Sequence, residues 1–173
     1  QRQGDSDEAL KAFTEAVLLY GEMGDTRAEA NLVHMIGLIY KTKGQIDSAL
    51  SSFREAMRLY HEMDDGQGEA KELNDIGQIY RDQGNLEEAL TYYQKALKIN
   101  QTFKDQYGEA STLMNIAFVY VSRGDSEEGL KLAREALKTF QKIGAQKEAA
   151  TVAENIKKAE ELLKRRKKEK SKK

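Results

Sequence analysis

The sequence of 173 residues contains no cysteine, no proline and no tryptophan. Without cysteine the chain can form neither disulfide bonds nor thiolate centres, and this composition is compatible with the cytoplasm, where we expect the protein to act. The absence of proline, together with 33% charged and 39% hydrophobic residues, favours a soluble helical protein. No stretch approaches the ~20 apolar residues that span a bilayer, and residues 1–5 carry no signal-like apolar segment, so we expect no membrane insertion.

Basic residues are outnumbered by acidic ones in most of the chain and are concentrated at its end. Residues 164–173 hold eight Lys or Arg and one Glu, which leaves 20 Lys or Arg against 28 Asp or Glu in residues 1–163. Such an end could attract nucleic acid, anionic lipid or an acidic partner, but we favour a disordered, solubilising tail. The acidic body has no basic stripe with interleaved aromatics, so we expect no sequence-specific nucleic-acid recognition.

Groups that carry catalytic or metal chemistry are also few. His34 and His61 are the only histidines, and we interpret His34 as a plain surface or groove residue and His61 as a helix-surface residue. No His-Glu-x-x-His pattern, cysteine cluster or twelve-residue calcium loop accompanies them. Residues 64–66 begin like a metal loop, yet an inter-repeat turn explains them better. The sequence therefore predicts no enzyme, no metal and no cofactor.

What the sequence does contain is an internal repeat of 40 residues. The residues that recur at this spacing are the tyrosines Tyr40, Tyr80 and Tyr120, the glycines Gly4, Gly44, Gly84 and Gly124, and the alanines Ala16, Ala56, Ala96 and Ala136. A fixed period between 20 and 50 residues indicates a stacked array in which each unit covers its apolar face against its neighbours. Function should then lie on an extended surface.

Each unit is predicted to be a pair of helices. In one unit, residues 31–43 and 49–60 show apolar residues at helical spacing, with Gly44 between them. Aspartates at 25, 65 and 105 precede the first helix of each unit and are expected to cap it. The predicted organisation is a partial first repeat in 1–24 (the end of a first helix plus a second helix), repeats in 25–64, 65–104 and 105–145, a capping helix in 146–164 and a basic disordered tail in 165–173.

Small residues recur where the two helices of a unit would meet. At Gly37 and Gly77 two helix backbones can approach closely while an aromatic ring fills the adjacent space. The last unit departs from this pattern, because Ala133 stands where the others carry Phe53 or Tyr93. We therefore expect its second helix to pack less tightly.

The pattern of Ile36, Gly37 and Tyr40, followed by Ala49 and Phe53, resembles the tetratricopeptide repeat. The resemblance implies an all-α right-handed superhelix of antiparallel helix pairs, with the first helix of each pair lining the concave side. Units of 40 residues are similar to those of kinesin light chains, Pins/LGN-type polarity adaptors and prokaryotic signalling proteins.

The resemblance also predicts a ligand groove on the concave side. Its predicted residues are Asn31, His34, Leu38, Lys41, Lys71, Asn74, Gln78, Arg81, Ser111, Met114, Asn115, Phe118 and Val121. The cations and amides of the family's carboxylate clamp for chaperone C-termini are missing here, so we reject that specificity. In the polarity adaptors, groove asparagines and cations hold an extended peptide, and the equivalents here are Lys71, Asn74, Arg81 and Asn115.

Three of the predicted groove residues, Met114, Phe118 and Val121, form a strip that is too apolar for a solvated helix face. We expect a ligand to cover this strip, with the C-terminal helix or a neighbouring molecule as the alternatives.

These observations predict a non-catalytic protein-protein interaction module that binds a peptide or helical segment in its concave groove, an acidic segment among the candidates. One alternative is a regulatory or sensor subdomain of a larger signalling protein. Another is a structural scaffold that self-associates through the incomplete first repeat.

Overall fold

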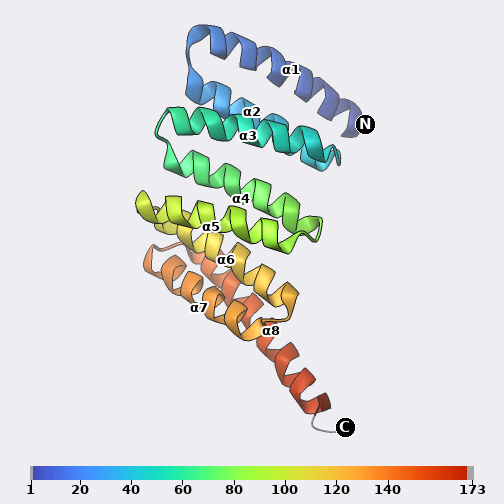
Figure 1. Ribbon diagram of the computed structural model, residues 1–173, viewed down its shortest axis with the longest axis vertical. Helices are drawn as coiled ribbons and strands as arrows, with labels where there is room; N and C mark the ends of the chain where they lie inside the picture. Colours follow the sequence, from blue (N-terminus) through green and yellow to red (C-terminus); the bar gives the residue numbers. More distant parts are fainter. Residues whose placement is uncertain (1, 171–173) are drawn as a thin grey trace.

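The computed structural model describes the backbone of residues 2–170 and the side chains of residues 6–165. Within this range the chain forms helices joined by turns of two or three residues, namely α1 (Arg2–Met23), α2 (Thr26–Thr42), α3 (Ile46–Glu62), α4 (Gly66–Asp82), α5 (Leu86–Thr102), α6 (Gln106–Arg123), α7 (Ser126–Lys142) and α8 (Gln146–Lys170). The helices stack from α1 at one end of the molecule to α8 at the other (Figure 1). The fold is the predicted all-α right-handed solenoid of antiparallel helix pairs.

The turns follow from the residues that the repeat provides. The glycine after the first helix of each pair adopts a positive φ, of 72° at Gly44, 82° at Gly84 and 96° at Gly124, a conformation that glycine reaches without steric cost. The predicted helix caps are confirmed, because the three aspartates accept hydrogen bonds of 2.9–3.0 Å from the backbone N–H three residues later: Asp25, Asp65 and Asp105.

The close approach of paired helices at glycine is also confirmed. A Cβ atom added at Gly37 would lie 2.7 Å from the ring of Phe53, and one at Gly77 would lie 2.6 Å from the ring of Tyr93. Both rings are fully buried. The ring of the second helix therefore rests directly on the backbone of the first.

The expectation of loose packing in the last pair is wrong. A Cβ atom at Gly129 of α7 would lie 2.7 Å from the carbonyl oxygen of Ala117 in α6. Gly129 and Ala133 are both buried, so α7 comes close to the backbone of α6 without a ring between them. In the other two pairs an aromatic ring of the second helix contacts the backbone of the first. In this pair, which lacks the ring, the backbones of the two helices contact each other.

Two predicted boundaries also need correction. The expected break near the start of the chain is absent, since α1 runs unbroken from Arg2 to Met23. The tail predicted for residues 165–173 is helical as far as Lys170, because Lys, Arg and Glu are good helix formers and neither Gly nor Pro stops α8. Residues 171–173 lie outside the described residues.

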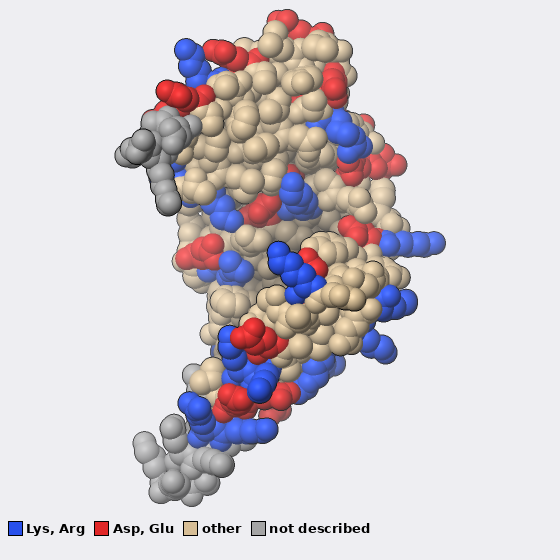
Figure 2. All heavy atoms as spheres, turned by 180° about the vertical axis from the view of Figure 1, so that it is seen from behind, with Lys and Arg blue, Asp and Glu red and all other residues tan. Residues whose placement is uncertain are grey.

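Charges of both signs are exposed near the α8 end of the molecule, where Figure 2 shows Lys and Arg interspersed with Asp and Glu. None of the helices in the described range is long and apolar enough to cross a membrane.

We predict that Gly77→Leu destabilises the array, because the new side chain would occupy the space of the Tyr93 ring. Overpacking of this kind costs about 1–3 kcal/mol or more. Thermal unfolding followed by circular dichroism measures the effect. Gly21→Leu is the matched control, since a Cβ atom there would meet only the Glu29 carboxylate at 3.6 Å. If Gly77→Leu melted at the same temperature as the parent, the ring-on-backbone contact would not limit stability.

Candidate binding groove

Side-chain hydrogen bonds join the first helices of consecutive pairs, α2, α4 and α6. Lys41 Nζ of α2 donates to Gln78 Oε1 of α4 at 3.0 Å. Asn74 Nδ2 of α4 donates to Thr112 Oγ1 of α6 at 2.9 Å, and Asn115 Nδ2 of α6 donates back to Asn74 Oδ1 at 3.2 Å. The partners lie about one repeat apart in sequence, so these bonds align the corresponding faces of the first helices.

A polar pocket of about 410 Å³ lies between α4 and α6. Five predicted groove residues line it: Lys71, Asn74, Gln78, Ser111 and Asn115. Asp75 and Asn100 line it too, and sequence reasoning missed them as site residues. Asn100 of α5 is 2% exposed and donates to Thr112 Oγ1 at 3.1 Å. The sequence does distinguish Asn100, because the other second helices carry an aromatic residue at this repeat position.

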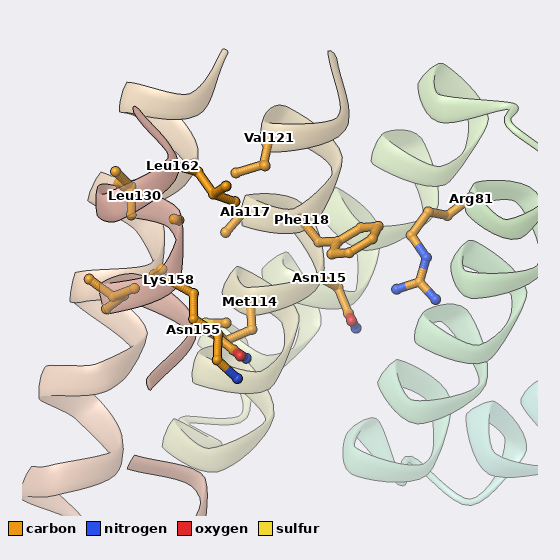
Figure 3. Close-up of a pocket in the computed structure, with 14 residues that line it drawn as sticks. Arg81, Met114, Asn115, Ala117, Phe118, Val121, Leu130, Asn155, Lys158 and Leu162 are labelled. Atoms are coloured by element: carbon orange, nitrogen blue, oxygen red, sulfur yellow. The ribbon is translucent and has the colours of Figure 1, made fainter. Parts of the chain in front are cut away.

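An apolar pocket of about 460 Å³ lies between α6, α7 and α8 (Figure 3). The predicted groove residues that line it are Arg81, Met114, Asn115, Phe118 and Val121, and the other lining residues are Ala117, Gly129, Leu130, Ala133, Asn155, Ile156, Lys158, Ala159 and Leu162. Asn115 belongs to both pockets, so the polar and apolar pockets adjoin along α6.

The apolar pocket exists because of the substitutions in the last pair. Where α3 and α5 carry Phe53 and Tyr93, α7 carries Ala133, and the missing ring leaves space beside the close contact of α6 with α7, on the side where α8 lines the pocket. Gly129, at the point of closest approach to α6, also lines the pocket. The substitution is visible in the sequence, but the cavity beside it was not predicted.

The apolar strip on α6 forms one wall of this pocket. Phe118 is 55% exposed and Val121 is 41% exposed, while Met114 is half-buried against the core shared by α6, α7 and α8. The guanidinium of Arg81 lies 4.9 Å from the centroid of the Phe118 ring, within the range of a cation-π interaction. Ile156, Ala159 and Leu162 bring α8 to the same pocket. α8 therefore borders the strip and leaves Phe118 open.

The predicted residues on α2 do not join these two pockets. Asn31 accepts a hydrogen bond from the Tyr60 hydroxyl at 2.7 Å, and Leu38 is 37% exposed. The prediction that His34 is a surface or groove residue is wrong, because its side chain is buried between α2 and α4. His34 contacts Glu72 there, and its ring centroid lies 5.6 Å from that of Phe53.

Glu72 is the buried partner that explains the position of His34. Its carboxylate is fully buried, with oxygens 2.9 and 3.1 Å from His34 Nδ1. Glu72 was not predicted as a site residue, although it precedes the buried Ile76 and Ile79 by four and seven residues on the same helix face. Burial raises the pKa of Glu72 above its usual range, against the opposing effect of His34.

His34, Glu72 and Asp75 are the one group of ligand atoms among the described residues close enough to share a metal ion, all within 4.8 Å of one another. Burial raises the pKa of Asp75, and the positive charges of Lys41 and Lys71 act against that shift. These two lysines also oppose a bound cation, so their charges disfavour a metal ion at this position.

Comparison with known families agrees with this architecture. The family model of the tetratricopeptide repeat matches residues 69–142, and the model of the soluble NSF attachment protein family, SNAP, matches residues 1–96. The chain belongs to the tetratricopeptide repeat family. Repeats of this family serve as protein-interaction or regulatory modules. No curated protein matches the chain at a significant level.

Solved structures share the fold at low sequence identity. BtubC from P. vanneervenii has a TM-score of 0.69 at 18% identity, with 95% of this chain and 76% of that chain covered. The apo form of RapI has a TM-score of 0.81 at 17% identity, with 95% and 46% covered. The N-terminal domain of stress-induced protein-1 from C. elegans has a TM-score of 0.59 at 15% identity, with 78% and 96% covered. The chain thus spans less than half of RapI.

We predict that the contribution of Glu72 to stability falls as the pH rises. Because its folded pKa is raised, the folded protein keeps a proton that the unfolded chain, with a pKa of about 4.3, has lost. The stabilising contribution of protonated Glu72 is therefore complete below the pKa of Glu72 in the unfolded chain. It is lost as the pH rises through the pKa of Glu72 in the folded protein. Urea unfolding from pH 4 to pH 8 should show the parent losing stability relative to Glu72→Gln, which carries no titrating proton.

Glu135→Gln, at an exposed position of α7, is the control for this comparison. A stability difference between the parent and Glu72→Gln that stays constant over the whole pH range would contradict the raised pKa.

Proposed function

We propose that this chain is a non-catalytic protein-interaction module that binds a peptide segment along α6, with a large apolar side chain of the peptide inserted in the apolar pocket. The observation that carries this proposal is the exposure of Phe118, 55%, at a pocket of about 460 Å³ lined mostly by apolar side chains. Exposed aromatic residues beside a pocket are typical anchors of protein interfaces.

The surrounding charges favour a segment that also carries acidic side chains. Arg81 and Lys158 line the apolar pocket, and the exposed Lys71 lines the adjoining polar pocket. Each of the first two already faces an acidic neighbour, Asp82 at 2.7 Å and Glu154 at 2.6 Å. A peptide carboxylate would compete with these pairs, of which the Lys158 pair is exposed and contributes little to stability on its own, whereas Arg81 is partly buried.

The amides of the polar pocket suit the backbone of an extended segment. Asn115 lines both pockets, so a peptide anchored at Phe118 could continue along α6 and reach Asn74 and Gln78. Amide side chains can donate to peptide carbonyls and accept from peptide N–H groups. This arrangement supports recognition of the peptide backbone beside an apolar anchor.

We predict that Phe118→Ala weakens peptide binding about fivefold or more, since truncation of an aromatic anchor commonly costs above ~1 kcal/mol. The ligands are peptides selected on the parent protein from a random display library, and titration calorimetry measures their affinity. The melting temperature should change little because Phe118 is half exposed.

Met35→Ala is the matched control, because Met35 is 44% exposed on α2 and lines neither pocket. Equal losses of affinity in both variants, or none in Phe118→Ala, would place the peptide elsewhere. A large drop in melting temperature for Phe118→Ala would instead assign the ring a structural function.

We also predict that the double variant Lys71→Gln/Arg81→Gln binds acidic library peptides more weakly and with less dependence on salt. Charges at the rim of an interface act mainly on the association rate and its salt dependence. Stopped-flow association at several salt concentrations measures both quantities. The control is Lys138→Gln/Lys142→Gln on α7, outside both pockets. Identical rates for parent and double variant at low salt would rule out the proposed acidic preference.

A further inference from the structure

The first helix, α1, carries a second apolar surface that lies apart from the groove. We define the α1 face as Leu10, Phe13, Leu19, Tyr20 and Met23. Leu19 is 59% exposed, Tyr20 36% and Met23 75%. Leu18, next to this face, is 66% exposed, whereas the same repeat position holds a lysine or arginine in α3, α5 and α7. A helix that faced only water would rarely carry so many large apolar residues.

Comparison of α1 with the equivalent helices of the other repeats indicates what the α1 face contacts. Five positions at the 40-residue spacing are buried in every other second helix: Ala49, Leu50, Phe53, Ala56 and Tyr60 in α3, Ala89, Leu90, Tyr93, Ala96 and Asn100 in α5, and Gly129, Leu130, Ala133, Ala136 and Phe140 in α7. None of the matching residues of α1 is buried. The α1 face is therefore the same surface without its cover among the described residues.

On α3 this cover is provided by α2. The Phe53 ring lies against Gly37 of α2, and the Tyr60 hydroxyl donates to Asn31 of α2 at 2.7 Å. Ala30 and Val33 of α2 share one core cluster with Tyr60. The covering helix thus supplies a small residue opposite the ring, apolar residues along one stripe and a polar acceptor near its start.

We propose that the α1 face binds one amphipathic helix of the same kind as α2, supplied by another polypeptide segment and laid antiparallel to α1. The face continues an established interface, because Leu10, Phe13 and Tyr20 repeat the residues of α3 that α2 covers. The bound helix places glycine or alanine opposite Phe13, since a larger residue would meet the ring as a Cβ atom at Gly37 would meet Phe53. It also offers an acceptor to the Tyr20 hydroxyl.

Charge favours such a helix over a second copy of α1. Residues 6–23 contain four Asp or Glu and one Lys, so two α1 faces would bring together surfaces of the same sign. A covering helix with basic flanks, like the region of α2 with Arg27 and Lys41, complements them.

The test uses the parent protein and a synthetic peptide of residues 25–45, which spans α2 and carries three Lys or Arg against two Asp or Glu. We expect fluorescence anisotropy to show binding of this peptide. The matched control peptide carries Gly37→Leu and should bind at least about tenfold more weakly, because the leucine prevents close approach to Phe13.

On the protein side, Leu19→Gln/Met23→Gln should reduce binding at least about tenfold without loss of stability, since both residues are exposed. Ile143→Gln is the control, because Ile143 is 36% exposed and occupies the repeat position of Met23 after α7. Equal binding of the two peptides, or unchanged binding by the double variant, would overturn the proposal.

A free peptide of this length pays an entropic cost to become helical, so a fusion provides the second measurement. Joining a copy of residues 25–45 directly to Ser6 reproduces the spacing between Gln45 and Ile46. We expect this fusion to melt ~2–4 °C or more above the parent, and the same fusion with Gly37→Leu in the grafted copy to show no such gain. No gain in either fusion would overturn the proposal.

Sedimentation equilibrium of the parent tests whether a second copy of the chain covers the α1 face instead. A dimer that Leu19→Gln/Met23→Gln dissociates, combined with no peptide binding, would assign the α1 face to a second copy of the chain and overturn the assignment to an α2-like helix.

Discussion

The close approach of the two helices in a pair depends on the contact between an aromatic ring of the second helix and a glycine of the first. At Gly37 and Gly77 the absence of a side chain lets the rings of Phe53 and Tyr93 rest on the helix backbone, and this contact sets how closely the helices of a pair approach. One face of each first helix is occupied by its contact with the second helix of the same pair. The opposite faces of α2, α4 and α6 can therefore form side-chain hydrogen bonds with one another between consecutive pairs. The geometry of the groove therefore depends on a contact that lies behind it.

In the last pair, α6 and α7 approach closely without a ring between them, and the apolar pocket lies beside this contact. With Ala133 in place of a ring, α7 approaches α6 through Gly129, and space opens beside the exposed face of α6. The pocket thus arises where the sequence departs from its own repeat, as expected if local departures from a consistent pattern mark functional sites. α8 contributes a further wall of this pocket through Ile156, Ala159 and Leu162.

Features that recur every 40 residues could be predicted from the sequence, whereas features that occur once could not. The helix pairs, their aspartate caps and the contacts at Gly37 and Gly77 all follow from periodic residues. The contact of His34 with Glu72 joins the same two repeat positions as the contact of Asn74 with Thr112. A histidine and a glutamate stand at these positions in one repeat only, so the repeat did not predict the buried pair. The end of α8 was misplaced because a run of basic residues suggests disorder by composition, while the same residues have high helix propensity.

The two pockets would contribute differently to binding. In the polar pocket Asn74 already bonds to Thr112 and Asn115, so a peptide that bonded to these amides would exchange existing hydrogen bonds for new ones. Such exchange yields little net free energy but fixes the position of the peptide backbone. Phe118, by contrast, exposes apolar surface that only a bound side chain would remove from water, and that removal is favourable by about 25 cal/mol per Å². The apolar pocket should therefore provide most of the binding free energy. The polar pocket should fix the position of the peptide backbone along the groove. A ligand with the right backbone spacing but no apolar anchor would align in the groove without staying bound.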